Sequence, residues 1–410
     1  MCQPNRVTAL IGAGASLELG VPSTDDATKK VLEGEPGEEE HQSNKESLSI
    51  LTQTLAILRQ SAPKAVPNFE HLLHALEIMV TMRRAWRSTG GSDLRNIFGL
   101  LTNGPKSELL PLFQAGLAEQ AINQLFCRLH AVFSDHRPAD TRPAEWSNYE
   151  QFWRSLARSY GLDIATTNYD DLLEQAIPTL NQGFVPITDE ETSRFTPNEL
   201  RQAWDRLVHL HGSIHFGYRD FRVNSNRFAF QDSWNDVYWH KNPPHAQRSW
   251  GGRSNPHAQS GEELVIGPLL TGLQKPDKVL AAEPYATYYR TLGNWLEANS
   301  RLLVVGYGFG DAHINSLLSR ITSWHGDSRK VVLITHLPEN EWVHLRHDVD
   351  HRVEEKMAIS GWSEDDEIWR DQMFHYSDTW TSKNGLCRVY LGGLLPTSGQ
   401  YLQDILSFLS

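Results

Sequence analysis

The chain has 410 residues and a formal net charge of −12 at pH 7, from 38 basic and 50 acidic side chains. This length can bury a full hydrophobic core and is sufficient for more than one structural unit. The acidic balance argues against a broad electrostatic surface for nucleic acid, so we expect no direct nucleic-acid binding. The cysteines Cys2, Cys127 and Cys387 lie far apart, which excludes a disulfide framework or a four-cysteine zinc site within one chain.

The sequence also carries information about the compartment. Its first residues lack the apolar segment of a signal peptide, and no apolar run is long enough to cross a membrane. The few, scattered cysteines fit a reducing environment. We therefore expect a cytoplasmic protein with no membrane contact.

A glycine-rich turn follows the first apolar segment and reads Gly12-Ala13-Gly14-Ala15-Ser16. Glycines permit backbone angles closed to other residues and let a ligand approach the main chain. We expect a helix to begin near Ser16 and to direct free amide groups at a phosphate. A dehydrogenase would place a second strand with an acidic residue about 20 residues later. Residues 22–40 instead read as a helix and an acidic loop, which argues against hydride transfer.

The next part of the chain is rich in helical periodicity. Apolar residues recur at helical spacing in 46–60 and 68–88. We interpret residues 25–159 as a largely α-helical insertion between the first strand and the next.

Four further buried strands are predicted at 162–166, 207–210, 301–305 and 330–335. Continuous apolar strands, each followed by a turn or helix, favour a parallel sheet that is covered on both faces. The predicted fold is α/β, a Rossmann-like parallel sheet with helices on both faces. The core of this fold would comprise residues 1–24 and 160–336.

Two segments fall outside this core pattern. Residues 217–260 are rich in Asn, Arg, Trp, Pro, Gly and His and are interpreted as a loop or lid. Residues 337–410 form a C-terminal extension, in which 387–391 is expected as an edge strand. The tryptophans of this extension favour an assembly interface.

Polar motifs follow the predicted strands where each one ends, which is where ligands bind in such sheets. They are the turn 12–16, the segment Thr167-Asn168-Tyr169-Asp170, the pair His211-Gly212, and Gly306-Tyr307-Gly308-Phe309-Gly310-Asp311. Each has a structural interpretation: Asn168, Asp170 and Asp311 can cap helices, and His211 can be a core histidine. In combination and in this order the four motifs are far more specific.

The set resembles the sirtuin family, and more closely the sirtuin-like NAD-consuming proteins of bacterial anti-phage defence. Gly12–Ser16 is similar to the family's Gly-Ala-Gly-x-Ser phosphate loop, and 167–170 to its Gln-Asn-x-Asp element, with Thr167 in place of Gln. His211-Gly212 resembles the His-Gly element, and 306–311 the Gly-Tyr-Ser-Phe-Gly-Asp turn of the bacterial branch. Asn68-Phe69-Glu70-His71-Leu72-Leu73 is also similar to a helix of that branch. The resemblance covers roughly residues 5–335.

Two departures separate the chain from protein deacylases of that family. The scattered cysteines cannot form the deacylase zinc module, so the resemblance is to a branch that lacks it. The deacylase pattern Gly-Ile-Pro-Asp-Phe-Arg is also incomplete, because Gly20-Val21-Pro22 is followed by Ser23-Thr24. Both differences argue against peptide deacylation and leave NAD cleavage intact.

The resemblance implies an NAD glycohydrolase, with NAD as the substrate and no metal. Asn168 would orient water and ribose, and His211 would be the general base. The residues expected to bind NAD are Gly12, Ala13, Gly14, Ser16, Thr167, Asp170, Gly306, Gly308 and Asp311. Lys275 and Lys278 lie near the expected site, but surface positions are the simpler interpretation.

Alternative functions remain open at this point. One is an NAD-dependent protein deacylase or ADP-ribosyltransferase, and another is a non-catalytic scaffold that binds NAD or ADP-ribose. By the same resemblance, the hydrolase would deplete NAD during phage infection. An activity of that kind requires restraint, which we expect from a homo-oligomer or from a HerA-type ATPase partner encoded nearby.

Overall fold

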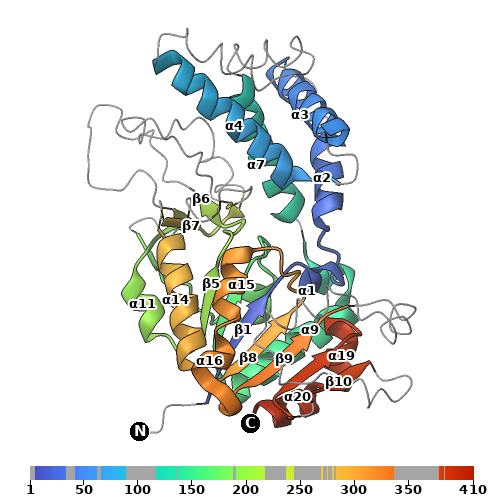
Figure 1. Cartoon of the computed structure of the whole chain (residues 1–410), viewed down its shortest axis with the longest axis vertical. Helices are drawn as coiled ribbons and strands as arrows, with labels where there is room; N and C mark the ends of the chain where they lie inside the picture. The colour runs from blue at the N-terminus through green and yellow to red at the C-terminus, as the bar shows by residue number, and fades with distance from the viewer. Residues whose placement is uncertain are drawn as a thin grey trace.

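The structure is a computed structural model of the chain (Figure 1). It describes residues 5–33, 42–61, 66–88, 117–134, 136–187, 191–217, 237–243, 269–270, 275, 279–280, 283–336, 378–382 and 384–410. Among these residues, no helix has the length and apolar character needed to span a membrane.

The central element is a sheet of seven strands in the order β10-β11-β9-β8-β1-β2-β5. Six of these strands run parallel, and only β10 is antiparallel to its neighbour. This arrangement confirms the α/β, Rossmann-like prediction. The strands are β1 (Arg6–Ile11), β2 (Gly161–Thr166), β5 (Arg206–His209), β8 (Arg301–Val305), β9 (Lys330–Ile334), β10 (Thr379–Thr381) and β11 (Cys387–Tyr390).

The order of the parallel strands defines where a ligand can bind. From β1 through β2 to β5 the chain builds the sheet in one direction, and from β8 through β9 to β11 it builds in the other. The direction reverses between β1 and β8, whose residues pair in register from Thr8 with Leu302 to Ile11 with Val305. In doubly wound sheets the ligand site lies beyond the carboxyl ends of the strands at this switch point.

Helices cover both faces of the sheet, as expected for strands that are apolar on both sides. One face packs against α9 (Pro143–Ser159), α10 (Leu172–Ala176), α19 (Leu394–Gln400) and α20 (Leu402–Leu409). The other packs against α14 (Tyr285–Ala298), α15 (Ala312–Leu318) and α16 (Ile321–His325). Shorter elements are α8 (Pro138–Thr141), α11 (Pro197–Gln202) and the 3₁₀ helix η4 (Gly326–Ser328). Phe152, Trp153 and Tyr285 are among the largest fully buried side chains.

The helical insertion stands at the top of Figure 1, above the carboxyl ends of the strands. It contains α2 (Thr24–Glu33), α3 (Gln42–Ser61), α4 (Phe69–Ser88) and α7 (Leu117–Ser134), which pack against one another. The α9 helix lies within the predicted range 25–159 but packs on β2. Within the described residues of this range the chain is largely helical, and α9 belongs with the sheet.

A second, antiparallel sheet was not predicted from the sequence. It has the order β3-β4-β7-β6, with β3 (Phe184–Pro186), β4 (Thr192–Phe195), β6 (Phe216–Gly217) and β7 (Tyr238–His240). The β7 strand falls inside the segment 217–260 that was interpreted as a loop or lid. Most of that segment lies outside the described residues.

The C-terminal extension is part of the main sheet. The β11 strand pairs with β9 on one side and with β10 on the other. The strand expected at 387–391 is therefore present, but the expectation that it forms the edge of the sheet is wrong. The edge strand is β10, which precedes β11 in the chain. Residues 337–377, with their tryptophans, lie outside the described residues.

A buried carboxylate connects three strands of the main sheet near their amino-terminal ends. Asp163 of β2 is fully buried and accepts hydrogen bonds from Arg6 of β1 and Arg206 of β5. Asn299 donates a further hydrogen bond to the same carboxylate at 2.9 Å. One charge therefore connects three neighbouring strands at the edge away from the switch point.

Replacing Asp163 by alanine would leave two arginines near an empty space, and we expect it to cost about 3–5 kcal/mol of unfolding free energy. Urea unfolding would measure the loss. The control is Glu191→Ala, which removes an exposed ion pair with Lys241 at 4.0 Å and should cost less than about 1 kcal/mol. Similar losses in both variants would contradict a structural role for this carboxylate.

Candidate functional site

The glycine-rich turn after β1 packs directly on the turn after β8. The Gly12 amide donates to the Val305 carbonyl and the Gly14 amide to the Gly306 carbonyl, both at 2.9 Å. A Cβ on Gly12 would lie 2.5 Å from the Tyr307 Cα, and one on Gly306 would lie 2.1 Å from the Ala15 nitrogen. Gly306 also has a φ of 61°, in the left-handed region. Glycine is therefore required because the two backbones touch at the switch point.

The helix after this turn differs from the prediction in start and length. α1 (Gly14–Leu17) begins two residues before Ser16 and forms a single turn. The amides of Gly12, Gly14, Ala15 and Ser16 already donate to protein carbonyls. The free amides expected here for a phosphate are therefore engaged within the protein, whereas Ala13 is exposed at the tip of the turn.

Ser16 connects the glycine turn to the residues after β2. The Asn168 side-chain amide donates to the Ser16 hydroxyl at 2.9 Å, and the same hydroxyl hydrogen-bonds to the Asp170 carboxylate. All three side chains are buried. With its Nδ2 held in this way, Asn168 retains a buried Oδ1 that has no hydrogen-bond partner among the described residues. A buried acceptor without a donor is costly, and such an atom marks a position that a ligand or water would satisfy.

Burial raises the pKa of Asp170 from its ordinary value of 3.8 to about 6, despite the hydrogen bonds from Ser16 and from the Leu172 amide. An ionised Asp170 therefore destabilises the fold above pH 6. Protonation removes this penalty as the pH falls from about 6 towards 4, because the folded state takes up its proton first.

Asp170→Asn should accordingly stabilise the protein at pH 8, by up to about 3 kcal/mol, and much less at pH 5. Thermal unfolding at the two pH values would measure the difference. Asp327→Asn, on the exposed η4 helix, is the control and should change stability by under about 0.5 kcal/mol at either pH. An equal gain at both pH values would contradict the raised pKa of Asp170.

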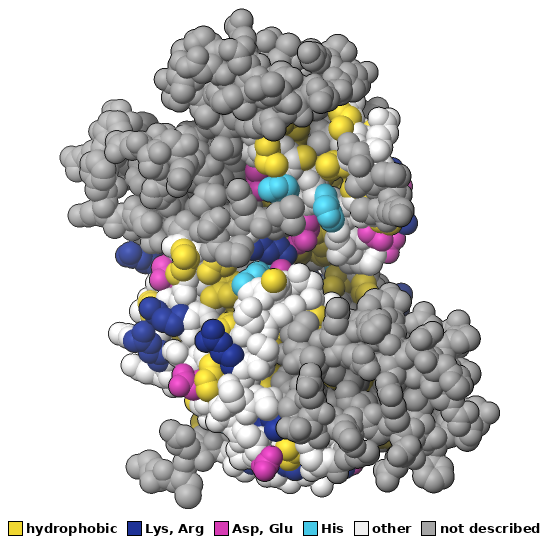
Figure 2. Space-filling model, in the orientation of Figure 1, with side chains coloured by type: hydrophobic (Ala, Val, Ile, Leu, Met, Phe, Trp, Pro, Cys, Tyr) yellow, Lys and Arg dark blue, Asp and Glu magenta, His cyan; other side chains and the backbone are white. Residues whose placement is uncertain are grey.

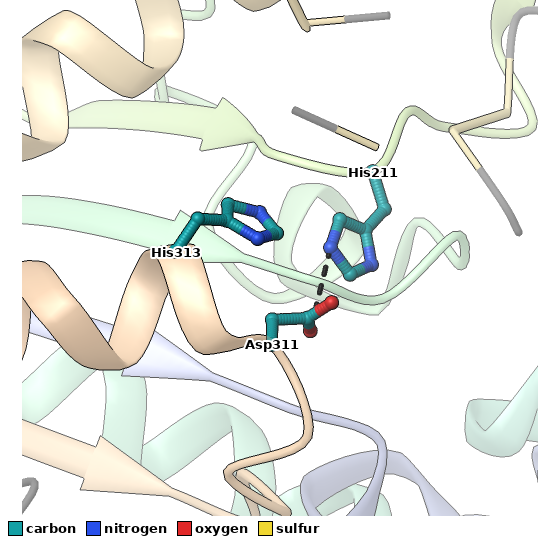
Figure 3. Close-up of side chains that lie close together, drawn as sticks. All are labelled: His211, Asp311 and His313. Carbon is teal, nitrogen blue, oxygen red and sulfur yellow. Dashed lines mark ion pairs between the residues drawn. The ribbon is translucent and has the colours of Figure 1, made fainter. Parts of the chain in front are cut away.

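His211 lies two residues beyond the end of β5 and is buried. Its Nε2 has no hydrogen-bond partner among the described residues and lies 3.5 Å from Oδ2 of Asp311, the contact drawn as a dashed line in Figure 3. Burial, reinforced by Lys275, lowers the pKa of His211 to about 3. The imidazole is therefore neutral at pH 7, and its Nε2 is close to Asp311 without forming an ion pair there. Its neighbour His209 faces elsewhere, bonded to Glu174 at 2.8 Å.

Asp311 is paired with a lysine that the sequence placed on the surface. The Lys275 ammonium lies 3.0 Å from Asp311 and 3.0 Å from Glu70, and the lysine is only 8% exposed. The surface interpretation of Lys275 is therefore wrong. Burial opposes its charge, but the two carboxylates raise the pKa of Lys275 above its ordinary value. Lys278 lies outside the described residues.

Asp311 and two histidines beside it have the composition of a metal site. His211, Asp311 and His313 each offer a ligand atom, and these atoms lie within 4.8 Å of one another (Figure 3). However, the Lys275 ammonium already balances the Asp311 carboxylate, and Nε2 of His313 is hydrogen-bonded to the Tyr289 hydroxyl at 2.9 Å. A second positive charge would be repelled by Lys275 at short range. The charges thus favour an ion pair over a cation site.

The turn that follows β8 is strained at one residue. Phe309 has a φ of 55°, which is uncommon for a bulky side chain. Asn315 of α15 holds this conformation by donating to the Phe309 carbonyl at 2.8 Å. A Cβ on Gly308 or on Gly310 would meet nothing within 4 Å, in contrast to Gly306. This turn therefore leaves open space beside its two outer glycines, next to Asp311.

Thr167 has a structural position among the predicted residues. Its amide and its hydroxyl both donate to the Ile11 carbonyl, at 2.9 and 3.3 Å. It thereby joins the ends of β1 and β2, and its hydroxyl is occupied by the protein. The predicted residues thus come together at the carboxyl ends of four adjacent strands, β5, β2, β1 and β8, with the exposed Ala13 at the tip of the turn.

This arrangement agrees with a comparison of the sequence with protein-family models. Residues 163–360 match the model described as SIR2-like domain. SIR2-like domains use NAD, and the match supports a sirtuin-like, NAD-related protein. No curated protein matches the chain.

The matched range begins within β2, so the glycine turn after β1 lies outside it. The structure nevertheless places this turn at the centre of the sheet, against Gly306 of the matched range. The glycine turn after β1 therefore lies directly beside the matched range, at the same edge of the sheet.

Sequence reasoning missed a second buried pair in the matched range, formed by His215 and Asp171. His215 hydrogen-bonds to the His240 carbonyl at 2.8 Å, and its Nε2 lies 3.4 Å from Asp171. Burial opposes the charged form, but the Asp171 carboxylate raises the pKa of His215. The spacing of His215 from His211 gave no signal for this pair, because its partners come from other elements.

Proposed function

We propose that the chain is an NAD glycohydrolase that cleaves the bond between nicotinamide and ribose to give nicotinamide and ADP-ribose. The observation that carries this proposal is a pair of buried side-chain atoms, Oδ1 of Asn168 and Nε2 of His211, for which the described residues offer no hydrogen-bond partner. They follow β2 and β5, at the edge where a Rossmann-like sheet binds its ligand. The SIR2-like match supports NAD as that ligand.

The chemistry of the bond fits these two groups. As the bond breaks, nicotinamide leaves with the electron pair as a neutral molecule, and positive charge develops on the ribose. Water then adds to the ribose C1′ and must lose one proton. Neutral imidazole can accept this proton at Nε2 and release it to solvent. Asn168 Oδ1 can accept a hydrogen bond from the water or from a ribose hydroxyl, while Ser16 fixes its amide nitrogen.

The rest of the site would bind NAD. The exposed Ala13 and the open space at Gly308 lie in the two turns at the switch point, where a pyrophosphate would approach. Asp311 has a carboxylate that can accept hydrogen bonds from a ribose. Gly12, Gly14, Gly306 and Thr167 would act indirectly, because their contacts hold the strand ends together.

Incubation of the purified chain with NAD, followed by chromatography, tests the proposal. We expect equal amounts of nicotinamide and ADP-ribose without any peptide. Nicotinamide release that requires an acylated peptide would indicate a deacylase instead, and transfer of ADP-ribose to protein would indicate a transferase. Tight NAD binding without product under any condition would indicate a scaffold.

We also propose that this activity depletes NAD in anti-phage defence, within the cytoplasm and under control of a homo-oligomer or of a HerA-type ATPase. The basis is the resemblance of the four motifs to those of the sirtuin-like NAD-consuming proteins of bacterial anti-phage defence. Measuring cellular NAD during phage infection, with and without the neighbouring gene product, tests this role. NAD levels that are unaffected by the chain in infected cells would contradict it.

A further inference from the structure

The contact between the helical insertion and the sheet contains a charge cluster, in which a buried lysine lies between two partly exposed carboxylates. Glu70 belongs to the first turn of α4, and Asp311 precedes α15 at the carboxyl edge of the sheet. The Lys275 ammonium lies 3.0 Å from each carboxylate. Figure 2 shows Lys or Arg, Asp or Glu, and His side chains gathered at the level where the two parts meet. One lysine therefore bridges the insertion and the candidate site.

The position of Glu70 is fixed by the start of its helix. The Asn68 side chain accepts a hydrogen bond from the Glu70 amide at 3.0 Å and caps α4. The Phe69 amide donates to Thr28 of α2 at 2.9 Å, and the Phe69 ring is buried. The backbone of Glu70 is therefore fixed in the first turn of α4. Any displacement of α4 would move Glu70 with it.

On the other side of the bridge, the connection continues to His211. The second oxygen of Asp311 lies 3.5 Å from the His211 Nε2, while the first binds Lys275. A second contact supports the same segment: His130 of α7 hydrogen-bonds to the Ile214 carbonyl at 2.7 Å. Both α4 and α7 of the insertion therefore touch residues that position His211.

We propose that Lys275 is a positioning residue that couples the helical insertion to His211, so that a partner or assembly that displaces α4 alters NAD cleavage. The proposal names the regulation of the site and rests on the proposed function. With Lys275 in place, Asp311 is held and neutralised. When α4 withdraws Glu70, the lysine loses one of its two anions and the position of Asp311 relaxes.

The electrostatic consequence can be measured. Of the residues that the structure describes, the charged and titratable groups that act on His211 are Lys275, Asp311 and His313. Removing the lysine charge leaves Asp311 as the nearest full charge, which favours protonated His211. The pKa of His211 should then rise towards neutrality, and more of the base would be lost at mildly acidic pH.

The test compares Lys275→Met, Lys275→Arg and Glu70→Gln with the wild type. The matched control is Lys241→Met, which removes an exposed lysine paired with Glu191 at 4.0 Å. In Lys275→Met we expect kcat to fall about 10-fold. We also expect the acid limb of the pH profile to move to higher pH. Lys275→Arg should keep most of the activity, because the charge remains. Glu70→Gln should lower kcat without moving the acid limb to higher pH.

Two readouts do not need NAD cleavage. Hydrogen exchange of the first turn of α4 should accelerate in Lys275→Met and in Glu70→Gln but not in Lys241→Met. Titration of the His211 imidazole by NMR, assigned with His211→Ala, should show a higher pKa in Lys275→Met. If the wild type does not cleave NAD, the proposed function fails while these readouts still decide the bridge. If hydrogen exchange in α4 and the His211 pKa in Lys275→Met are the same as in Lys241→Met, the proposed role of Lys275 is overturned, even if the wild type cleaves NAD.

Discussion

In a His211→Ala variant we expect NAD hydrolysis to fall by about 10²–10⁴-fold, the range typical of a positioned general base. The physical reason is that the imidazole is buried and neutral, and that its Nε2 has no hydrogen-bond partner within the described part of the chain. NAD binding should change far less, because His211 is expected to act on the attacking water. Steady-state kinetics together with calorimetric NAD binding would separate the two effects.

The matched control for this variant is His325→Ala. His325 ends α16 at the opposite edge of the sheet and bonds to the Leu296 carbonyl at 2.7 Å. Its removal should leave hydrolysis close to that of the wild type. Equal activity of the wild type and His211→Ala would show that the imidazole is not the base.

A Gly306→Ala variant should lose stability strongly, by about 3 kcal/mol or more, if it folds at all. The new Cβ would lie 2.1 Å from the Ala15 nitrogen and 2.5 Å from the Gly14 carbonyl carbon, both backbone atoms, and the residue has a positive φ. Neither neighbour can rotate away, so the two strand-end turns would separate. Chemical unfolding, with circular dichroism to confirm folding, would measure this loss.

Gly308→Ala is the control for stability, since its Cβ meets nothing within 4 Å and it lies in the same turn. We expect its unfolding free energy to stay within about 0.5 kcal/mol of the wild type. The two variants thus separate a glycine required by packing from a glycine beside open space. Comparable losses in both would contradict the close approach of the turns.

The fold could be predicted because its strands carry local signals. The segments around Val304 and Leu333 are apolar without alternation, which is typical of parallel strands buried on both faces. The second sheet could not be predicted in this way, since its strands have only two to four residues. Pairing of β11 between β9 and β10 likewise depends on distant partners rather than on its own sequence.

The site was predictable in composition but not in its internal contacts. Asn168 and His211 could be found because each follows a strand and because the motifs resemble those of sirtuins. The engagement of the glycine-turn amides was not visible in the sequence, because Gly306 accepts one of them from nearly 300 residues away. Lys275 was misplaced for a similar reason, since a lysine is buried only when distant acids such as Glu70 pair with it.

The most direct test of the central claim is NAD cleavage by the purified chain in ¹⁸O-labelled water, alone and with the neighbouring gene product. Asn168→Ala would be measured beside it, with the exposed Asn198→Ala as the control. We predict equal nicotinamide and ADP-ribose, with the label on the ribose C1′ oxygen, and loss of both products in Asn168→Ala only. NAD that binds the wild type but releases no nicotinamide, or release that is unchanged in Asn168→Ala, would contradict the account.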